Sequence, residues 1–597
     1  MTVSRILVAN RGEIAARVLR ACTRSGIEGV AVHTPGDTAH LAGAGGAEQI
    51  DSYLDGAAII AAARRMDADA VHPGYGFLAE NADFARAVVD AGLVWIGPDP
   101  EVIDLMGRKD RAREVAERAG VPVTPRHDPA AVPADAYPVL VKAAAGGGGK
   151  GMHVVRDAAE LEAALATAAR EAAAAFGDDT LLVEKFVEGG RHVEVQVFGD
   201  RHGNVVHLLD RDCSVQRRHQ KVVEEAPAPD LAPAVRERIR SAAVALSREV
   251  GYVGAGTVEF LVQGTEAYFL EMNTRLQVEH PVTEEVTGTD LVAWQIAVAN
   301  GERLPLTQDR IVADGHAIEV RVYAEDPYGG FLPQAGRVDA VRWPTDTARV
   351  ETVVTDGTAV TSAFDPMLAK IITSGPDRDA AIEAMLAALD GTAIFGVTTN
   401  TGFLARVVDS PTFRTAAMDT GWLDRKPDEV LAPPQVPPRA LAVAAGLLWP
   451  EVGDGWRSAG PSAPIVRPVV DAGGERHDVV ETAEPTEPHL VQGPRAQVAI
   501  AGQVWTFERP DGTRRPRVVH AGDAEILAPM PGSVIAVDVT VGDTVEAGQR
   551  LGAVEAMKME LALTAPHDGV VTQVPVVGAQ VKMGDLLFHV DPDAQEA

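Results

Sequence analysis

The stretch Gly256-Thr257-Val258-Glu259-Phe260-Leu261, followed by Tyr268-Phe269-Leu270-Glu271-Met272-Asn273, predicts a β-hairpin. Because side chains alternate along a strand, Glu271 and Asn273 share one face, and Glu259 can join them from the neighbouring strand. The other face is apolar and is formed by Val258, Phe260, Leu270 and Met272. Two carboxylates and an amide that converge beside a hydrophobic core would repel one another unless a cation lies between them. A set of oxygen ligands suits Mg²⁺ or Mn²⁺. We therefore expect Glu259, Glu271 and Asn273 to hold a metal ion, with carboxylates on a wet sheet face as the alternative.

The segment directly after this hairpin combines the groups needed to bind a small anion. It reads Asn273-Thr274-Arg275-Leu276-Gln277-Val278-Glu279-His280. Arg275, Gln277 and Glu279 take alternate positions, so a continuing strand would present all three on one face. A cation, an amide and a carboxylate together can hold and deprotonate a small anion, although a surface salt-bridge cluster would have the same pattern.

A glycine-rich run lies between two short apolar stretches. It reads Lys142-Ala143-Ala144-Ala145-Gly146-Gly147-Gly148-Gly149-Lys150-Gly151-Met152 and is flanked by Val139–Val141 and His153–Val155. The flanking stretches predict strands, so the run is a hairpin loop and not a flexible linker. It is not a P-loop, because no G-K-[ST] opens a helix. Backbone without side chains can approach phosphates closely, and the two lysines add positive charge.

The net charge excludes several classes of partner. The chain has 597 residues and a formal net charge of −31, which argues against nucleic acid and against anionic membranes. An anionic substrate then needs a local basic pocket, and the basic run from Arg211 to Lys221 (RDCSVQRRHQK) fits this need. The two cysteines, Cys22 and Cys213, form neither a disulfide framework nor a zinc site. The N-terminus lacks the apolar core of a signal peptide, and the longest apolar run, 440–449, is too short to span a bilayer, so we expect a soluble, cytoplasmic chain.

The tail of the chain contains an internal repeat. The segment 528–534 (APMPGSV) is echoed by 565–571 (APHDGVV), and 541–548 (VGDTVEAG) is echoed by 577–584 (VGAQVKMG). Two copies of short strands predict a small β-sandwich with pseudo-twofold symmetry. Glu555-Ala556-Met557-Lys558-Met559 lies between the copies, so Lys558 is expected at an exposed hairpin tip. A lone surface lysine is usually only solvated, but two neighbouring methionines at a tip indicate recognition by another protein.

The rest of the chain alternates strand-like and helical runs up to about residue 427, which is typical of an α/β fold. Prolines cluster between 428 and 438 and predict a linker, and a second candidate hinge is 509–523. An almost wholly apolar helical run, 440–449, follows the first linker and must be covered on most faces. We expect it to be covered by its own small β-domain, by a partner chain, or by both.

These motifs resemble known families. The Met-Lys-Met tip within its repeat looks like the biotin-attachment motif of biotinyl domains, which implies biotin linked to Lys558. Lipoyl domains share that fold but usually carry other residues beside the lysine. The first 425 residues, including the stretch His72–Asn81 (HPGYGFLAEN), resemble the biotin carboxylases, which have an ATP-grasp fold.

The resemblance implies a role for each matching residue. Arg275, Gln277 and Val278 would hold bicarbonate, Glu279 would be its general base, Arg321 would stabilise the enolate form of the biotin ureido group, and Tyr75 would lie near the biotin. Lys221 would take part in catalysis at the ATP site. The remaining ATP-binding positions would be Lys109, Lys142, Gly147, Gly148, Met152, Glu184, Lys185, Val187, His192, Gln216 and His219.

The resemblance also implies a multidomain α/β architecture. The expected parts are a biotin carboxylase N-terminal α/β domain (1–110), an ATP-grasp domain with a glycine-rich lid (111–310), a carboxylase C-terminal α+β domain (311–427), a linker with a helix-plus-β-barrel docking domain (428–522), and an all-β biotinyl carrier domain (523–593). The chain departs from the family in a short, Gly/Ala-rich 33–50 segment and in Phe364, which replaces a common tyrosine.

The implied function is that of an acyl-CoA carboxylase alpha subunit. ATP and bicarbonate would carboxylate the biotin on Lys558, and a separate carboxyltransferase beta subunit in a hetero-oligomer would pass the carboxyl group to an acyl-CoA. A biotin protein ligase would attach the biotin. Asp419–Leu423 (DTGWL) leans towards the methylcrotonyl type. The alternatives are the carboxylase component of a pyruvate or urea enzyme, an ATP-grasp ligase with a lipoyl-type carrier, and a non-catalytic biotin-carrying scaffold.

Overall fold

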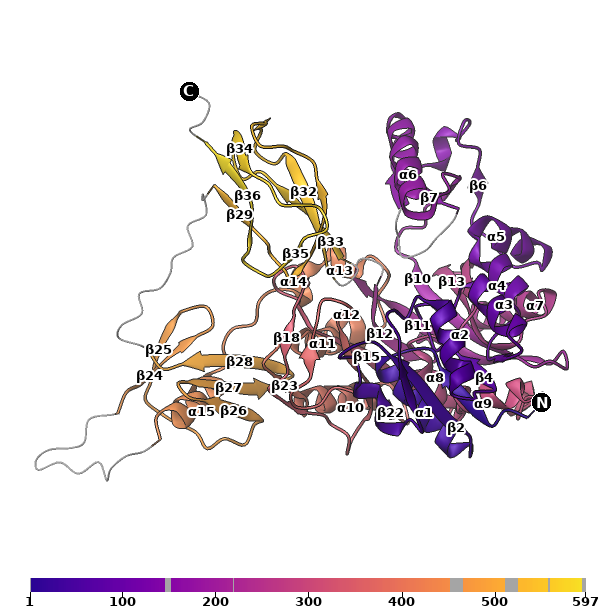
Figure 1. Cartoon of the computed structure of the whole chain (residues 1–597), viewed down its shortest axis with the longest axis horizontal. Helices are drawn as coiled ribbons and strands as arrows, with labels where there is room; N and C mark the ends of the chain where they lie inside the picture. Colours follow the sequence, from indigo (N-terminus) through magenta and orange to yellow (C-terminus); the bar gives the residue numbers. More distant parts are fainter. Residues whose placement is uncertain are drawn as a thin grey trace, which may run out of the picture.

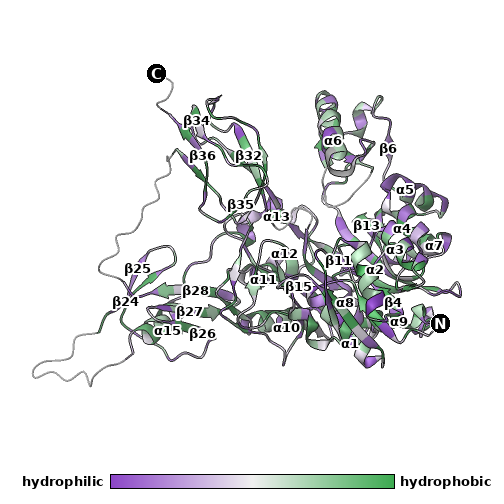
Figure 2. Cartoon of the chain, in the orientation of Figure 1, coloured by the Kyte–Doolittle hydropathy of each residue, from purple (hydrophilic) through white to green (hydrophobic). Residues whose placement is uncertain are grey.

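A computed structural model gives the structure of the chain and describes residues 2–144, 152–217, 220–450, 465–510, 524–556 and 559–592. For residues 174–176, 556 and 559 it describes the backbone only. Figure 1 shows a large body from which a lid and a C-terminal β-sandwich rise on the same side, while a middle domain extends away from it. Hydrophobic residues occur in every one of these parts (Figure 2), and each has a core of its own.

The N-terminal part of the body is built on a parallel sheet of order β3-β2-β1-β4-β5. Its inner strands are runs of Val, Ile, Leu and Ala buried on both faces, as parallel strands require. The strands are β1 (Arg5–Val8), β2 (Glu28–His33), β3 (Ala47–Gln49), β4 (Ala70–His72) and β5 (Val94–Trp95). The helices are α1 (Gly12–Arg24), α2 (Gly56–Arg65), α3 (Ala82–Asp90), α4 (Pro100–Gly107) and α5 (Lys109–Arg118).

One eight-stranded antiparallel sheet joins the two expected domains 111–310 and 311–427. Its order is β14-β13-β10-β11-β12-β15-β22-β20, so β15, which follows residue 310, pairs with β12, which precedes it. Its strands are β10 (Arg191–Gly199), β11 (Val205–Arg217), β12 (Gln220–Ala226), β13 (Gly254–Gln263), β14 (Glu266–Asn273), β15 (His316–Tyr323), β20 (Arg349–Thr352) and β22 (Met367–Gly375). This one sheet carries the expected metal residues Glu259, Glu271 and Asn273 together with His192, Gln216, Lys221 and Arg321.

Helices and short strands cover this sheet. The helices are α7 (Pro233–Glu249), α8 (His280–Thr287), α9 (Leu291–Ala299), α10 (Arg378–Asp390), α11 (Thr401–Asp409), α12 (Pro411–Arg414), α13 (Trp422–Arg425) and α14 (Pro427–Val430). The short strands are β16 (Glu325–Asp326), β17 (Leu332–Pro333), β18 (Gly336–Arg337), β19 (Ala340–Arg342), β21 (Ala359–Val360) and β23 (Ala393–Phe395). Val430 of α14 is fully buried in the body, so the proline-rich segment begins as part of this core.

The lid is a small sheet of order β6-β9-β7-β8 covered by α6 (Leu161–Phe176). Its strands are β6 (Arg126–His127), β7 (Val139–Ala143), β8 (Met152–Val155) and β9 (Leu181–Lys185). β7 and β8 pair antiparallel, with Lys142 opposite Met152, which confirms the predicted hairpin. Its glycine-rich loop lies outside the described residues.

The middle domain packs one helix against a five-stranded sheet. α15 (Pro438–Leu448) buries Ala440, Val443, Ala444, Ala445 and Leu448 against Val469, Ala496, Val498 and Phe507 of this sheet. The strands are β24 (Arg467–Asp471), β25 (Arg476–Val479), β26 (His489–Gln492), β27 (Arg495–Ile500) and β28 (Gln503–Glu508). The apolar helix therefore fills the core of its own domain, which was one of the expected covers.

The C-terminal sandwich confirms the predicted repeat. Its two sheets have the orders β29-β36-β34-β31 and β33-β32-β30-β35, and each strand of one sheet has its sequence equivalent in the other. The strands are β29 (Glu525–Leu527), β30 (Gly532–Val537), β31 (Thr544–Val545), β32 (Arg550–Ala556), β33 (Met559–Thr564), β34 (Gly569–Gln573), β35 (Gln580–Val581) and β36 (Leu586–Asp591). Lys558 falls between β32 and β33 and lies outside the described residues. No helix in the described ranges has the length and apolar character needed to cross a membrane.

Candidate active site

A single cavity of about 2390 Å³ opens between the body, the lid and the C-terminal sandwich. Every described residue of the expected site lines it: Tyr75, Lys109, Lys142, Met152, Glu184, Lys185, Val187, His192, Gln216, Lys221, Glu259, Glu271, Asn273, Arg275, Gln277, Val278, Glu279 and Arg321. The other expected residues, Gly147, Gly148, His219 and Lys558, lie outside the described residues. The sequence motifs, which are spread over 250 residues, thus converge on one place.

The expected metal-binding residues lie on the β13–β14 hairpin. Glu259 pairs with Glu271 across the two strands, and the amide nitrogen of Asn273 donates to Glu259 Oε1 at 2.8 Å. One expectation was wrong, because a β-bulge after Glu259 places Phe269, and not Leu270, in the core beside Phe260. Leu270 lines the cavity instead. A bulge adds one residue to a strand and so moves the following side chains to the other face.

The donor set fits a divalent cation by its chemistry. Burial is the main cause that raises the pKa of Glu271, and the negative charge of Glu259 raises it further. The two carboxylates are therefore close together and shielded from water. Carboxylate and amide oxygens are the ligands that Mg²⁺ and Mn²⁺ prefer, and an ion between these groups would relieve that repulsion.

The segment after β14 is a loop, which corrects the predicted strand. β14 ends at Asn273, and α8 begins at His280 behind Glu279, the residue at its N-cap position. Pro281 occupies the first turn of α8, where its fixed backbone favours a helix start. The loop still brings Arg275, Gln277 and Glu279 to the cavity.

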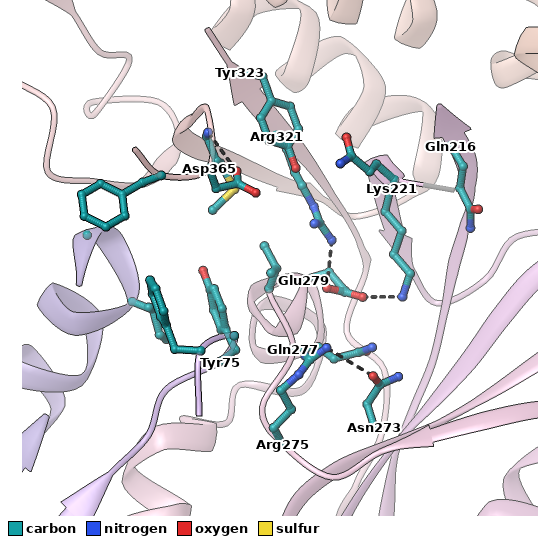
Figure 3. Close-up of a pocket in the computed structure, with 18 of the residues that line it drawn as sticks. Tyr75, Gln216, Lys221, Asn273, Arg275, Gln277, Glu279, Arg321, Tyr323 and Asp365 are labelled. Atoms are coloured by element: carbon teal, nitrogen blue, oxygen red, sulfur yellow. Dashed lines mark hydrogen bonds and ion pairs between the residues drawn. The ribbon is translucent and has the colours of Figure 1, made fainter. Parts of the chain in front are cut away.

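Glu279 lies between two cations (Figure 3). Lys221 Nζ donates to Glu279 Oε1 at 2.7 Å, and Arg321 Nη2 donates to Oε2 at 3.0 Å. Burial alone would raise the pKa of Glu279, but the charges of Lys221 and Arg321 outweigh it and hold the pKa well below its usual value. Glu279 is therefore ionised, as a general base must be before it takes a proton.

Lys221 is bound by three carboxylates. Its ammonium donates to Glu194 at 2.6 Å and to Glu259 at 3.0 Å as well as to Glu279. Burial would lower the pKa of Lys221, but Glu194, Glu259 and Glu279 together hold it well above its usual value. The described cations of the basic run, Arg211, Arg217 and Lys221, are thus paired with carboxylates inside the protein and do not form an exposed basic face.

Two of these buried partners were missing from the expected site. Glu194 is fully buried and binds both Lys221 and Arg211, whose Nε donates to it at 2.6 Å. The signal for Glu194 was present, because it alternates along β10 with the expected ligand His192. Arg211 is fully buried as well, and its guanidinium reaches Gln277 Oε1 at 2.9 Å.

His192 joins the metal face to Gln216. Its Nε2 lies 2.9 Å from Glu259 Oε2, and its Nδ1 lies 2.7 Å from Gln216 Nε2. Since the Gln216 amide nitrogen donates, Nδ1 is the acceptor. Burial would lower the pKa of His192, but the charge of Glu259 outweighs this and raises it. In this arrangement the imidazole is neutral, so Lys221 compensates the charge of Glu259 and His192 Nε2 contributes a further polar contact to it.

The lid contributes a second group of charges. Lys142 Nζ lies 2.8 Å from Glu184 Oε2, and Glu184 also accepts from Thr124 Oγ1 at 2.6 Å. Lys109, at the start of α5, faces the same space, and burial lowers its pKa. Lys109 and Lys142 place positive charge where an anionic nucleotide would enter between body and lid.

Tyr75 offers a hydroxyl with no hydrogen-bond partner among the described residues, although it is buried. Its ring lies 5.7 Å from Lys370 Nζ, and Lys370 donates to the backbone oxygen of Val278 at 2.7 Å. A buried hydroxyl that lacks a partner inside a ligand cavity is a group that a ligand can satisfy.

Arg275 is held from two directions. Its Nε donates to Glu80 Oε2 at 2.8 Å, and its Nη2 donates to Asn273 Oδ1 at 3.2 Å. Glu80 belongs to the His72–Asn81 stretch, so this pair connects the N-terminal sheet with the metal hairpin.

Comparisons with known proteins identify the class of enzyme. Residues 2–103 match the biotin carboxylase N-terminal domain, 108–307 the carbamoyl-phosphate synthase L chain ATP-binding domain, 319–425 the biotin carboxylase C-terminal domain, and 524–590 the "biotin-requiring enzyme" family. The biotin carboxylase domain of Hydrogenobacter thermophilus 2-oxoglutarate carboxylase, solved with MgADP, ADP and bicarbonate, is 43% identical over 73% of this chain and 100% of that one, with a TM-score of 0.70. Campylobacter jejuni biotin carboxylase is 42% identical over 71% of this chain and 99% of that one, with a TM-score of 0.68. The chain is an ATP-grasp enzyme with ATP-dependent carboxylase activity.

Relatives that match nearly the whole chain identify its family more narrowly. Methylcrotonoyl-CoA carboxylase subunit alpha of Dictyostelium discoideum is 38% identical over 96% of this chain and 93% of the relative. The propionyl-CoA carboxylase alpha chain of Ruegeria pomeroyi is 38% identical over 98% and 99%. The chain therefore belongs to the family of biotin-dependent acyl-CoA carboxylase alpha subunits.

Proposed function

We propose that the chain uses ATP and bicarbonate to carboxylate a biotin attached to Lys558, and that a separate carboxyltransferase beta subunit passes the carboxyl group to an acyl-CoA. The observation that carries the proposal is the shared cavity. It joins the lid lysine Lys142, the Glu259/Glu271 face and the Glu279 base to Glu555 of the C-terminal sandwich, three residues before Lys558.

In the first half of the reaction, Glu279 takes the proton of bicarbonate, which Arg275, Gln277 and the backbone at Val278 hold in place. The freed bicarbonate oxygen attacks the γ-phosphorus of ATP, and ADP leaves. Lys221, Lys109 and Lys142 stabilise the negative charge that builds on the phosphoryl oxygens. Glu259, Glu271 and Asn273 would hold the Mg²⁺ or Mn²⁺ that neutralises the same oxygens when bound.

In the second half, the carboxyphosphate formed in the first half splits into CO₂ and phosphate. The phosphate takes the N–H proton of the biotin ureido group, and the ureido nitrogen bonds to CO₂, while Arg321 and Tyr75 hold the biotin. Arg321 is fixed by Glu224 at 2.6 Å and is aimed at the cavity, where it can donate to the ureido oxygen. When its guanidinium turns to that oxygen, Glu279 loses one of two neighbouring cations, and its pKa rises towards the range where it accepts a proton well. One arginine thus connects arrival of biotin with activation of the base.

The proposed reaction requires two partner proteins. A biotin protein ligase must modify Lys558, and a carboxyltransferase must accept the carboxyl group. We assign the docking of the carboxyltransferase to the middle domain, because its described residues 465–510 expose Ile465, Val466, Val480 and Val491.

Co-expression with a biotin ligase, followed by mass spectrometry and a steady-state assay, tests the function. We expect a biotin adduct on Lys558 and ATP hydrolysis that requires bicarbonate and Mg²⁺ and is raised by free biotin. Lys558→Arg should spare the free-biotin reaction and abolish acyl-CoA carboxylation in the reconstituted complex, measured over a panel of acyl-CoAs. Biotin-dependent hydrolysis without bicarbonate, or no adduct on Lys558, would contradict the proposal.

A further inference from the structure

A ladder of aromatic rings forms one edge of the cavity. The Phe77 and Tyr53 ring centroids lie 5.2 Å apart, and Tyr53 and Phe364 lie 6.0 Å apart. The guanidinium of Arg11 lies 3.9 Å above the ring of Phe364. Phe77, Phe364 and Arg11 line the cavity, whereas the middle ring, Tyr53, is buried and does not line it.

Polar contacts make this ladder rigid. Asp37 accepts from Arg11 Nη2 at 2.9 Å and from the Tyr53 hydroxyl at 2.8 Å, and so joins Arg11, at one end of the ladder, to its middle ring. Phe77 has a positive φ of 45°, which is costly for a bulky residue and tends to occur where a side chain is presented to a ligand. A rigid platform loses little conformational entropy when something docks on it.

Beside the ladder, this edge of the cavity also carries exposed apolar side chains. Leu54 is 64% exposed and Phe77 is 40% exposed, and both line the cavity. Phe77 lies two residues from Tyr75, which faces the same space. We call Leu54 and Phe77 the apolar rim. Single exposed apolar residues are common, but two at the mouth of an active-site cavity lie where a second surface must approach.

The same cavity is lined by one end of the C-terminal sandwich. Gly532, Ser533, Glu555 and Gln580 contribute to it. Ser533 pairs with Glu555 on one side and with Gln580 on the other, so these residues form one patch. This patch is the biotin-bearing end, because β32 ends at Ala556 and β33 begins at Met559. Leu332 of the body packs against the core of the sandwich, so the sandwich is seated beside the cavity.

We propose that the apolar rim is the docking surface for the biotin-bearing end of this chain's own C-terminal sandwich during carboxylation. The proposal rests on the proposed function. Met557 and Met559 flank the biotin lysine in the sequence, and thioether groups make favourable contacts with aromatic rings. The rim would thus hold the carrier in place while Tyr75 and Arg321 serve the biotin itself.

Comparison of free and protein-bound biotin tests this surface. Leu54→Ser and Phe77→Asn remove the apolar groups, and asparagine tolerates the positive φ at position 77. Val312→Ser is the matched control, since Val312 is 66% exposed and does not line the cavity. The full-length biotinylated chain is used to measure two rates: bicarbonate-dependent ATP hydrolysis with free biotin, and single-turnover transfer of labelled bicarbonate to the biotin on the protein.

We expect the double variant to lose roughly tenfold in the protein-bound reaction, about 1.4 kcal/mol, and to keep the free-biotin reaction within about twofold. The control should keep both rates. An unchanged protein-bound rate in both single variants and in the double variant would overturn the proposal, and so would an equal loss in both reactions, which would assign the rim to the biotin pocket. If the unmodified chain lacked the free-biotin reaction, the proposed function itself would fail.

Discussion

Arg211 Nη2 donates to Gln277 Oε1 at 2.9 Å, and this contact fixes the direction in which the Gln277 amide faces. With its oxygen turned to Arg211, Gln277 presents its amide nitrogen to the cavity side, where it lies 2.9 Å from Glu259 Oε1. The remaining four N–H groups of Arg211 reach Glu194, Gln196, Thr257 and Thr283. The fully buried guanidinium of Arg211 thus fixes the positions of Gln277, which we propose binds bicarbonate, and of Glu194, a carboxylate partner of Lys221.

Arg211→Lys should weaken bicarbonate binding more than ATP binding. A lysine keeps the charge but cannot replace five donors in a fixed plane, so Gln277 and Glu194 lose their orientation. We expect the KM for bicarbonate to rise roughly tenfold to a hundredfold, because small misplacements at a reacting centre have effects of this size. The KM for ATP should change less than threefold, as measured by steady-state hydrolysis.

Arg378→Lys is the matched control, because Arg378 also binds a buried carboxylate, Glu225, but does not line the cavity. If Arg211→Lys raised both Michaelis constants equally, its role would be general stability and not the positioning of Gln277.

Glu279→Gln should remove most of the bicarbonate-dependent hydrolysis of ATP. The amide has nearly the same size but cannot accept the proton, and loss of a general base typically lowers rates by about 10² to 10⁴. Equilibrium nucleotide binding, measured by calorimetry, should remain, because the lid lysine Lys142 and its partner Glu184 are untouched. Glu285→Gln, which alters an ion pair with Arg349 outside the cavity, is the control. Undiminished hydrolysis in Glu279→Gln would exclude Glu279 as the base.

Acid should destabilise the fold through His72. Burial lowers the pKa of His72 from 6.5 to about 4, and its Nδ1 accepts the N–H of Gly74 in the turn that carries Tyr75. Because the folded-state pKa is below the unfolded one, the neutral imidazole stabilises the fold above pH 6.5, and this contribution is lost as the pH falls towards 4. The loss in the free energy of unfolding approaches about 3 kcal/mol, since a difference of one pKa unit between the folded and unfolded states corresponds to about 1.4 kcal/mol.

The measurement is denaturant unfolding of the unmodified protein and of His72→Asn between pH 7.5 and 4. Asparagine keeps an acceptor for Gly74 but does not titrate, so the stability difference between the two proteins should shrink as the pH falls. A difference that stays constant over this range would show that protonation of His72 does not contribute.

Local patterns in the sequence predicted the parts of the fold that local structure decides. The repeat around Lys558, the hairpin that flanks the glycine run and the α/β alternation all depend on residues near in sequence, and the structure has them. The strand predicted for Arg275–Glu279 was wrong, because Pro281 and the N-cap position of Glu279 start a helix directly after it.

Long-range pairing explains what the sequence did not reveal. In the sequence, Glu194 and Arg211 look like ordinary charged residues of strands. Their partners Lys221 and Gln277 lie on other elements, so these contacts become visible only when the pairing of β10, β11 and β12 is known. The bulge that turns Leu270 to the cavity depends on the register of two strands, which alternation alone does not give. Sequence patterns identified the residue types of the site, and the eight-stranded sheet determined which of them meet.

The five-stranded sheet of the middle domain contacts the body as well as helix α15 of its own domain. Ala499 packs against Ala393 and Phe395, and the backbone N–H of Ala501 donates to Asp390 at 2.7 Å. Removal of the whole domain would therefore expose an apolar part of the body and confuse docking with stability. Substitution of its exposed residues avoids this problem.

Val480→Asp combined with Val491→Asp should abolish co-purification with the carboxyltransferase subunit, while bicarbonate-dependent hydrolysis of ATP with free biotin stays within about twofold. Both valines are nearly half exposed, at 48% and 44%, so charges there can be solvated in the free chain but would be desolvated in an interface. Val89→Asp, at a position that is 50% exposed on the N-terminal part of the body, is the control and should leave capture intact. The measurement is pull-down of the tagged chain with its co-expressed partner. Full capture by the double variant would move the docking site away from these exposed positions of the middle domain, to the body or to the C-terminal sandwich.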